Sequence, residues 1–417
     1  MRAPYDREQW RRLADWLAIA VACAIPWSTS VAYILIGAWA FVLIPTVDRD
    51  DWRDVLKHPA AWLPIALIAL AASGMLWATG VEWDNRLEGF ASFGKLVSIP
   101  LLFVQFRNST RAHWVLLAFL VSCSLVLLLS WIMVFTGMKP ITRGATSYGV
   151  PVRDYIVQSQ EFILCAVGLI YLVYLRLRER RFGWALALAV LAALFLVNVT
   201  LVAPSRTGLV TVPVLLAILV IAHCRWQVSI AAVCAIVAAA VAVFAASPKI
   251  QGRLLAIATE IQDYRTRQAT TSAGERYEFW TTGIGIVAKA PVIGHGTGAV
   301  HDSFIRAAAE RGSRKPATTN PHNQTLTVAI QLGFAGALLL FAMWMSHALL
   351  FRGGGLAGWV GLAVVAQNVI GSLFNNHLFD FAQAWIYMFG VGVAGGMVLS
   401  QSLRASQFAV PQAAGRT

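Results

Sequence analysis

The sequence predicts an all-α protein that crosses a membrane many times. Hydrophobic residues make up 58% of its 417 residues and charged residues only 13%, whereas soluble globular proteins carry about 25% charged residues. Apolar runs follow one another along most of the chain, and many of the 16 tryptophans lie near the ends of these runs, where interfacial anchors are usual. This composition excludes an ordinary soluble enzyme, a disordered chain and a small disulfide-rich secreted module.

About twelve segments have the length and hydrophobicity of a spanning helix, which needs roughly 20 mostly apolar residues. A basic stretch precedes the first of them, as in a signal peptide, but no small-residue cleavage site follows, so we interpret this run as a retained helix. The predicted spans are 13–26, 28–45, 60–79, 89–105, 113–136, 157–175, 184–203, 205–222, 228–246, 326–350, 356–374 and 379–400.

The placement of Lys and Arg predicts the orientation of these spans. With the N-terminus in the cytoplasm, 17 of the 33 basic residues lie at cytoplasmic ends and five lie in short outside turns. Ten more lie in the long outside loop, which is largely exempt from the positive-inside rule, and Lys95 lies within a span. This distribution satisfies the positive-inside rule and places both termini in the cytoplasm. The orientation of the chain in the membrane therefore accounts for the net charge of +13. We expect no nucleic-acid partner.

One large extramembrane segment interrupts the spans. Residues 247–325 form an outside loop that separates the N-terminal transmembrane helices, 1–246, from the C-terminal helices and cytoplasmic tail, 326–417. Within the loop we expect helices at 249–263 and 275–289. A glycine-rich turn is expected after them, at Gly294, Gly296 and Gly298.

Arginine residues collect on the outside face. A guanidinium group binds phosphate through two parallel hydrogen bonds, so such a cluster suits an anionic lipid headgroup, above all a diphosphate. The alternative is general attraction to phospholipid headgroups. The basic residues of this face are Arg143, Arg153, Arg206, Arg253, Arg265, Arg267, Arg276 and His322.

Arg206 lies between two apolar segments that have almost no loop between them. A charge at that depth is costly and needs a partner. Ser205, Thr207 and the N–H groups at the start of the next helix could bind the same phosphate as Arg206. The alternative is an arginine that extends to a lipid phosphate.

Arg276 and Trp280 are one helical turn apart and share a face. Trp280 could anchor this helix in the interface while Arg276 points to a ligand. Arg276 could equally form a solvated ion pair with Glu275 or Glu278.

His322 lies just before a predicted span on the same face. Histidine accepts a proton readily near neutral pH, which makes His322 a candidate general base, although a lone histidine is more often structural. His377 follows Asn375 and Asn376 in the next outside turn and could join the site.

Motifs for metal chemistry are missing from the sequence. No Asp-x-Asp pair faces outside, no His-Glu-x-x-His motif is present, and the outside carboxylates are scattered. A divalent cation would need several oxygen ligands together. We therefore expect metal-independent chemistry without a cofactor, in which arginines supply the positive charge.

The ordered set of these motifs resembles the O-antigen ligase / O-antigen polymerase superfamily. The set comprises Ser205-Arg206-Thr207-Gly208, Arg276 with Trp280, Pro291 with the three glycines, and His322-Asn323 followed by Leu326 and Gly333. The resemblance covers about 190–335. It implies a membrane glycosyltransferase of the GT-C type that acts at the periplasmic face of the bacterial inner membrane.

The resemblance also implies substrates and roles. The ligase branch moves a glycan from undecaprenyl diphosphate to lipid A-core, with His322 as the essential histidine and Arg206 and Arg276 as essential arginines. We add Arg143, Arg153 and Arg265 as diphosphate ligands from their topology, and Ser205, Asn323, Trp280 and His377 as supporting residues. A single displacement assisted by His322 would invert the anomeric carbon. The alternatives are an O-antigen polymerase, a protein O-oligosaccharyltransferase, or a transporter or flippase for lipid-linked glycan.

Overall fold

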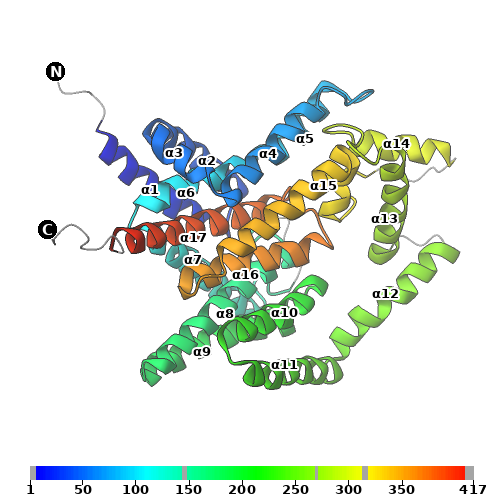
Figure 1. Cartoon of the computed structure of the whole chain (residues 1–417). Coiled ribbons are helices and arrows are strands. Elements are labelled where there is room, and N and C mark those ends of the chain that lie inside the picture. The colour runs from blue at the N-terminus through cyan, green and yellow to red at the C-terminus, as the bar shows by residue number, and fades with distance from the viewer. Residues whose placement is uncertain (1–5, 143–147, 268–270, 312–317, 409–417) are drawn as a thin grey trace.

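The computed structural model describes residues 6–142, 148–267, 271–311 and 318–408, which form helices and turns without a strand (Figure 1). Within these residues ten stretches are long and apolar enough to cross a membrane, which confirms an all-α polytopic membrane protein. They are α2 (Thr29–Leu43), α5 with α6 (Trp83–Gly94 and Ser98–Asn108), α7 (Ala112–Thr136), α8 (Tyr155–Arg178), α9 (Phe182–Val197), α10 (Arg206–His223), α11 (Trp226–Ala246), α15 (Gln324–Leu350), α16 (Gly355–Ser372) and α17 (Phe381–Phe408).

Two of the twelve expected spans do not qualify on their own. The first, α1 (Arg7–Ala24), has 18 residues, but charged side chains occupy its first half and Asp15 is buried within it. The second, α4 (Pro59–Gly74), has only 16 residues and meets α3 (Arg49–Leu56) at a bend of 93°. Counting this bent pair as one span gives eleven. The chain after Gly74 turns instead of continuing to residue 79 as predicted.

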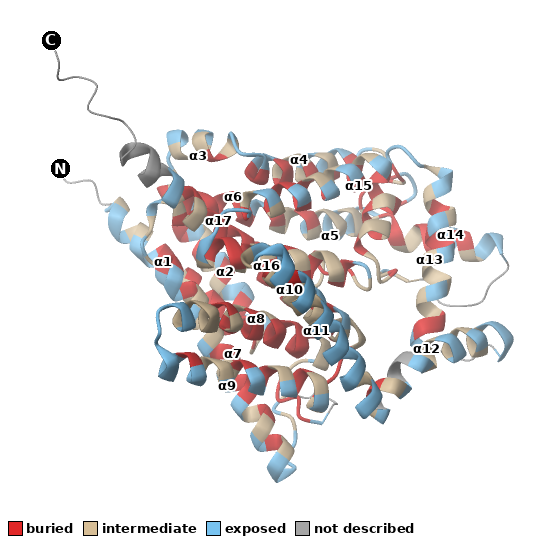
Figure 2. Ribbon diagram, turned by 60° about the horizontal axis from the view of Figure 1, so that its bottom comes forward, coloured by how far each residue is buried: buried red, intermediate tan, exposed pale blue. Residues whose placement is uncertain are grey.

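The buried centre of the bundle lies along α6, α8 and α17 (Figure 2). Three glycines of α17, at 392, 395 and 396, lie against α6. A Cβ atom on Gly395 would lie only 2.2 Å from the ring of Phe103. Small residues at such positions allow two helix backbones to approach closely, which is how apolar helices pack in a membrane.

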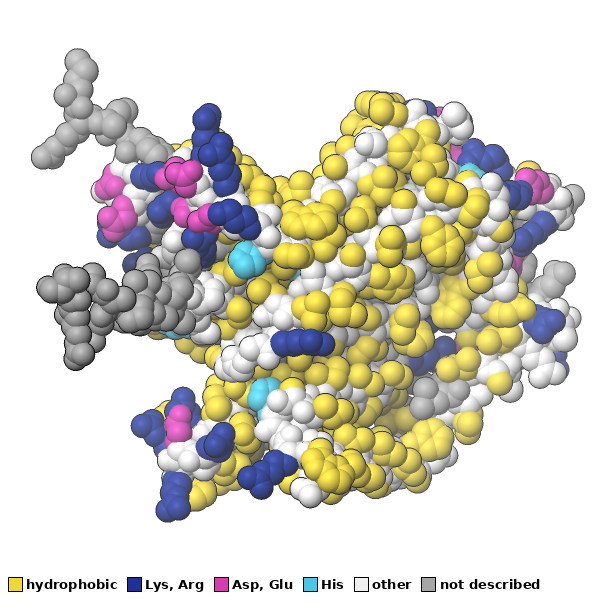
Figure 3. Space-filling view, viewed as in Figure 1, with side chains coloured by type: hydrophobic (Ala, Val, Ile, Leu, Met, Phe, Trp, Pro, Cys, Tyr) yellow, Lys and Arg dark blue, Asp and Glu magenta, His cyan; other side chains and the backbone are white. Residues whose placement is uncertain are grey.

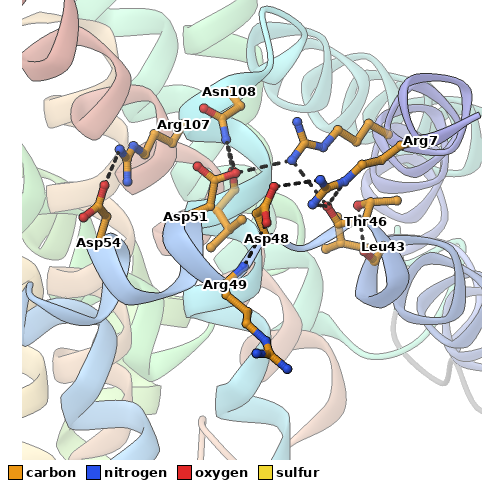
Figure 4. A network of polar contacts seen from close by, with 11 residues as sticks. Arg7, Leu43, Thr46, Asp48, Arg49, Asp51, Asp54, Arg107 and Asn108 are labelled. Carbon is orange, nitrogen blue, oxygen red and sulfur yellow. Dashed lines mark hydrogen bonds and ion pairs between the residues drawn. The ribbon is translucent and has the colours of Figure 1, made fainter.

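Charged side chains gather at the two ends of the bundle, with hydrophobic side chains covering most of the face between them (Figure 3). At one end, ion pairs join α1, α3 and α6 (Figure 4). Arg7 binds Asp48 at 2.7 Å and Arg107 binds Asp54 at 3.2 Å. The start of α1 and the end of α17 lie at this same end (Figure 1).

The opposite end carries α12 (Pro248–Arg267), α13 (Ser272–Lys289) and α14 (Val300–Glu310) (Figure 1). The first two overlap the helices predicted at 249–263 and 275–289, whereas α14 was not predicted. In both ribbon views α13 runs across the direction of the spans (Figures 1 and 2). This helix therefore lies over the end of the bundle instead of extending it.

The predicted glycine-rich turn fits into a break in α15. Gly333 interrupts this helix with φ +62° and ψ −157°. The N–H of Phe334 then donates to the carbonyl of Pro291 at 2.7 Å. A Cβ atom on Gly333 would lie 2.4 Å from the carbonyl of Val292, so only glycine allows this contact. The turn thereby fixes the outer part of α15, which carries the candidate site.

Candidate active site

The first candidate arginine lies at the capped start of α10. The Oγ of Ser205 accepts a hydrogen bond from the N–H of Gly208 at 3.0 Å, as an N-cap residue does. The same hydroxyl shares a 2.7 Å hydrogen bond with Ser159 of α8. Together these contacts fix the position of Arg206, the first residue of α10, at the end of the bundle that carries α12 to α14.

Arg206 forms an ion pair with Glu260 of α12, with 2.5 Å between Nη2 and Oε1. Both side chains are about one-quarter exposed, at 26% and 23%. Glu260 also accepts a hydrogen bond from the N–H of Ala273 at the start of α13, at 3.1 Å. The hydrogen bond from Arg206 lowers the pKa of Glu260. The carboxylate of Glu260 thus joins α10, α12 and α13. It is also the ion-pair partner that we expected for an arginine between two apolar segments.

Arg276 is a half-buried residue of α13 near this ion pair. Its Nε atom is buried, and no acceptor for it lies among the described residues. Burial, and secondarily the positive charge of Arg206, lowers the pKa of Arg276. Two guanidinium groups therefore lie close enough to repel one another, and the carboxylate of Glu260 interacts with both. Such an arrangement is completed by an anion.

His322 occupies the turn before α15 in a left-handed conformation, with φ +54°. Its N–H donates to the Oδ1 of Asn320 at 2.8 Å, which holds this turn. The imidazole ring stacks on Phe279 of α13, with ring centroids 6.3 Å apart. Burial lowers the pKa of His322, and the positive charge of Arg276 lowers it further. This shift favours the neutral form of the imidazole, which lies within electrostatic range of Arg276.

A hydrogen-bonded chain determines which nitrogen of His322 carries the proton. The Nδ2 of Asn375 donates to Asp380 at 2.9 Å, so its Oδ1 faces the His322 ring. That Oδ1 lies 2.8 Å from Nδ1 of His322. Because an amide oxygen only accepts, Nδ1 must be the donor, and the lone pair is on Nε2. No hydrogen bond to Nε2 is formed within the described residues, so this nitrogen can accept a proton.

Trp280 and Asn323 hold the turn from either side. The indole N–H of Trp280 donates to the carbonyl of Pro321 at 3.1 Å. The Oδ1 of Asn323 accepts from the N–H of Leu326 at 2.9 Å and caps α15. Trp280, placed as a membrane anchor by its sequence position, thus binds the turn that carries the candidate base.

Two of the other predicted arginines lie over aromatic rings. Arg265 stacks over Tyr277, next in sequence to Arg276, at 5.8 Å. Arg153 lies over the ring of Phe381 at 5.1 Å and has two buried nitrogens without an acceptor among the described residues. Arg143 lies outside the described residues.

His377 is turned into the bundle. It is 2% exposed and packs against Gly371 in α16, and burial lowers its pKa to about 4. Within the described contacts it makes none with His322; Asn375, two positions earlier, makes that contact instead.

Three further residues of the site were not chosen from the sequence: Glu260, Asn375 and Asp380. Asn375 and Asp380 belong to a polar stretch between two apolar spans. Polar residues at such a place are unusual enough to have indicated a functional role. Glu260 had no such signal, because it is one of two carboxylates on an amphipathic helix. Its role depends on how α12 packs beside α10.

The residues brought together can bind an anion and accept a proton. Two guanidinium groups provide the first function, and the Nε2 lone pair of His322 provides the second. In the described part of the chain, no three His, Cys, Asp or Glu side chains come together as a metal site.

Comparison with known families gives a match over this region. Residues 191–341 match the model of a family described as O-antigen ligase. The matched segment contains Arg206, Arg276 and His322, whereas Asn375 and Asp380 lie beyond it. A comparison of the chain with curated proteins gives no match. The match over residues 191–341 supports the assignment of this multi-pass membrane protein to the O-antigen ligase family.

Proposed function

We propose that this protein is an O-antigen ligase, a metal-independent, inverting glycosyltransferase of the GT-C type. It transfers O-antigen polysaccharide from undecaprenyl diphosphate to lipid A-core at the periplasmic face of the bacterial inner membrane. The family match supports ligase- or polymerase-type activity on lipid-linked glycan. The polytopic fold supports a donor that resides in the membrane.

The observation that carries the proposal is the convergence of Arg206, Arg276 and His322. The positive charge of Arg206 acts on Arg276, and that of Arg276 acts on His322. They come from α10, α13 and the turn before α15. Three charged or proton-accepting groups from distant segments thus lie within electrostatic range of one another, Arg276 interacting with both of the others. A diphosphate next to a reacting sugar hydroxyl needs this combination.

The reaction follows from these roles. The acceptor hydroxyl loses its proton to Nε2 of His322 while its oxygen bonds to the anomeric carbon. The bond from that carbon to the diphosphate oxygen breaks, and the electron pair leaves with undecaprenyl diphosphate. Arg206 and Arg276 stabilise the charge that develops on the diphosphate, an effect that is strong where water is excluded. Attack opposite the leaving group inverts the anomeric carbon.

The orientation proposed for the chain supports the periplasmic assignment. Among the termini and short loops, more basic residues are assigned to the end that holds the start of α1 and the end of α17 than to the opposite end. By the positive-inside rule this end is cytoplasmic, so the candidate site lies on the periplasmic side. Twelve crossings, with α1 and α4 included, would return the chain to the side on which it begins.

Reconstitution tests the proposal directly. Purified protein in nanodiscs, supplied with undecaprenyl diphosphate-linked glycan and lipid A-core in EDTA, should form glycosylated lipid A-core. His322→Ala should fold normally and lose about 10²–10⁴-fold in rate, while Asn108→Ala, at the opposite end of the bundle, should keep full activity. Transfer abolished by EDTA would overturn the metal-free mechanism, and unchanged rates in His322→Ala would reassign the base.

The same assay separates the alternatives. Glycan added to another lipid-linked glycan would indicate a polymerase, and glycan added to protein would indicate a protein O-oligosaccharyltransferase. In a parallel experiment with the protein in liposomes, movement of labelled lipid across the membrane without a new glycosidic bond would indicate a flippase.

A further inference from the structure

An apolar cavity lies in the bundle where α1, α7, α8, α16 and α17 meet. Its volume is about 250 Å³. An apolar cavity of about 150 Å³ is already large enough to hold benzene, and it stays dry because a buried water needs about two to four polar partners. Trp359, the largest side chain of the lining, donates its indole N–H to the carbonyl of Val167 at 3.2 Å. This donor is therefore not available to water, and the cavity suits an apolar occupant.

The cavity lies toward the end of the bundle opposite the candidate site. His113 and Leu356, in the first turns of α7 and α16, line it at this end. Arg107, which belongs to the ion pairs at that end, precedes His113 by six positions. Leu117, another residue of the lining, is 43% exposed, so the cavity opens to the surface of the bundle. An apolar molecule of the surrounding membrane can therefore enter it from the side.

The depth of the cavity matches one leaflet of a membrane. Its lining extends from Leu164 to Leu172 on α8 and from Leu356 to Val364 on α16, which is eight positions on each helix. At about 1.5 Å per residue this is roughly 12 Å, less than half of the ~30 Å hydrocarbon layer. The cavity therefore suits a phospholipid chain of the leaflet at this end, and it is too shallow for a chain that crosses the membrane.

Gly168 keeps the cavity open. It lies midway between Leu164 and Leu172 on the same face of α8 and belongs to the lining. A Cβ atom at this position would meet nothing within 4 Å. No side chain of the described residues fills the space beside this glycine, so an occupant must come from outside the chain.

Arginines lie around the mouth of the cavity. Three of the lining helices bring one to this end: Arg111 before α7, Arg176 in the last turn of α8 and Arg352 before α16. Arg111 and Arg176 pair with Asp15 and Glu179. Arg352 is exposed and forms no ion pair within the described residues. Because guanidinium groups bind phosphate and a basic surface attracts anionic lipids, the mouth favours a lipid with a negative headgroup.

We propose that this cavity binds an acyl chain of an anionic phospholipid, with its headgroup among these three arginines. The chain fills the space beside Gly168 and joins α7 to the other helices of the lining. The lipid is a structural ligand of the bundle and not a substrate. The proposal therefore does not depend on the reaction at the candidate site.

Gly168→Leu tests whether the cavity holds a lipid chain, because the new side chain occupies the same space. Gly37→Leu is the matched control: it adds the same side chain to α2, where a Cβ atom also meets nothing within 4 Å and does not line the cavity. Both variants gain the same helix propensity. Delipidated protein in detergent is titrated with dioleoyl phosphatidylglycerol, and the thermal unfolding temperature is measured.

The lipid should raise the unfolding temperature of the wild-type protein and of Gly37→Leu by about 3 °C or more. Gly168→Leu should unfold at a higher temperature than the wild type without lipid, and it should gain little when lipid is added. Equal gains in the two variants, or no gain in the wild type, would overturn the proposal.

Arg352→Gln tests the headgroup. The wild-type protein should reach half of its stabilisation at an about tenfold lower concentration of dioleoyl phosphatidylglycerol than of dioleoyl phosphatidylcholine. Arg352→Gln should lose most of this preference, whereas Arg53→Gln, an exposed residue of α3 at the same end, should keep it. Equal concentrations of the two lipids in the wild type would reject an anionic headgroup.

Photocrosslinking locates the chain in the wild-type protein. Phosphatidylglycerol with a benzophenone at the end of one acyl chain should label α7, α8 and α16 around Leu117, Gly168 and Val360. Gly168→Leu should suppress this labelling, and Gly37→Leu should not. Labelling confined to other helices, or equal labelling of the two variants, would overturn the proposal.

Discussion

At the scale of single residues, His322 is held on two sides. Asn375 fixes one ring nitrogen, and Phe279 stacks against the ring face. Asp380 in turn fixes the amide of Asn375. The hydrogen bond to Asn375 raises the pKa of His322, but burial and Arg276 outweigh it, so the pKa lies below its ordinary value. The proposed transfer needs the neutral imidazole, so activity should rise as pH increases through this pKa.

Asn375→Ala tests the orientation of the ring. Loss of the hydrogen bond removes the contribution that raises the pKa of His322, so the acid limb of the pH–rate profile should move to lower pH. The ring also loses its fixed tautomer, so kcat should fall, though by less than the ~10²–10⁴-fold expected for loss of the base. Steady-state rates across pH measure both effects. An unchanged acid limb together with an unchanged kcat would show that Asn375 does not position the base.

Arg276→Lys tests whether the planar guanidinium matters beyond its charge. Lysine keeps the positive charge but cannot offer two parallel N–H groups to a phosphate. A hydrogen bond between charged groups contributes about 1.5–3 kcal/mol, so the transfer rate should fall by about 10–100-fold. Arg267→Lys, an exposed residue of α12 that pairs with Asp263, is the matched control and should change nothing. Full activity in Arg276→Lys would show that Arg276 contributes only its positive charge.

Sequence patterns predicted the candidate site residues but not their partners. Arg206 and His322 lie in short motifs at the ends of spans, where a polar residue is conspicuous. Their partners lie far along the chain: Glu260 is 54 positions from Arg206, and Asn375 is 53 positions from His322. Such pairs depend on which helices pack together, and local patterns do not contain that information. The sequence analysis chose His377 and missed Asn375, because local sequence does not show which of the two side chains faces His322. Only the packing of the turn decides this.

At the scale of elements, the broken helix α15 links the site to the bundle. Its outer part follows the turn of His322, and its inner part packs in the core with α4 and α16. The turn after α13 fills the break at Gly333 through backbone hydrogen bonds. The sequence marked the glycines on both sides of this contact, but nothing in it indicated that the two segments meet.

Gly333→Ala should destabilise the protein. The positive φ alone costs roughly 1–3 kcal/mol for a residue with a Cβ atom, and the added atom also meets the backbone of Val292. The thermal unfolding temperature in detergent should therefore fall, and transfer should fall with it. Gly353→Ala, in the turn between α15 and α16, meets nothing within 4 Å and serves as the control. Equal melting temperatures for the two variants would contradict the role of the break.

At the scale of the whole molecule, hydrophobicity predicted the class of fold and most of its spans. The count of twelve exceeded the ten stretches that qualify by length and composition. The difference arises at α1, whose charged first half lies among the ion pairs of one end, and at α4, which is shortened by a turn. Both helices are held by neighbours, so their role in the bundle depends on packing as much as on their own hydrophobicity.

Cysteine labelling tests the orientation of the whole bundle. In a background without the five native cysteines, Glu310→Cys on α14 should react with a membrane-impermeant thiol reagent in spheroplasts. Asp50→Cys on α3, where the native side chain is 91% exposed, should react only after the membrane is permeabilised. The charge asymmetry between the two ends is the reason for this expectation. The reverse pattern would place the candidate site in the cytoplasm and exclude the proposed ligase.

Glu260 would affect the release of the lipid carrier in the proposed reaction. Because it already neutralises Arg206, the two arginines and this carboxylate together present one positive charge rather than two. A phosphorylated lipid that binds there would compete with Glu260 for Arg206, which would weaken its binding. When the carrier leaves, Glu260 would pair with Arg206 again. A moderate affinity of this kind would favour rapid turnover over tight capture.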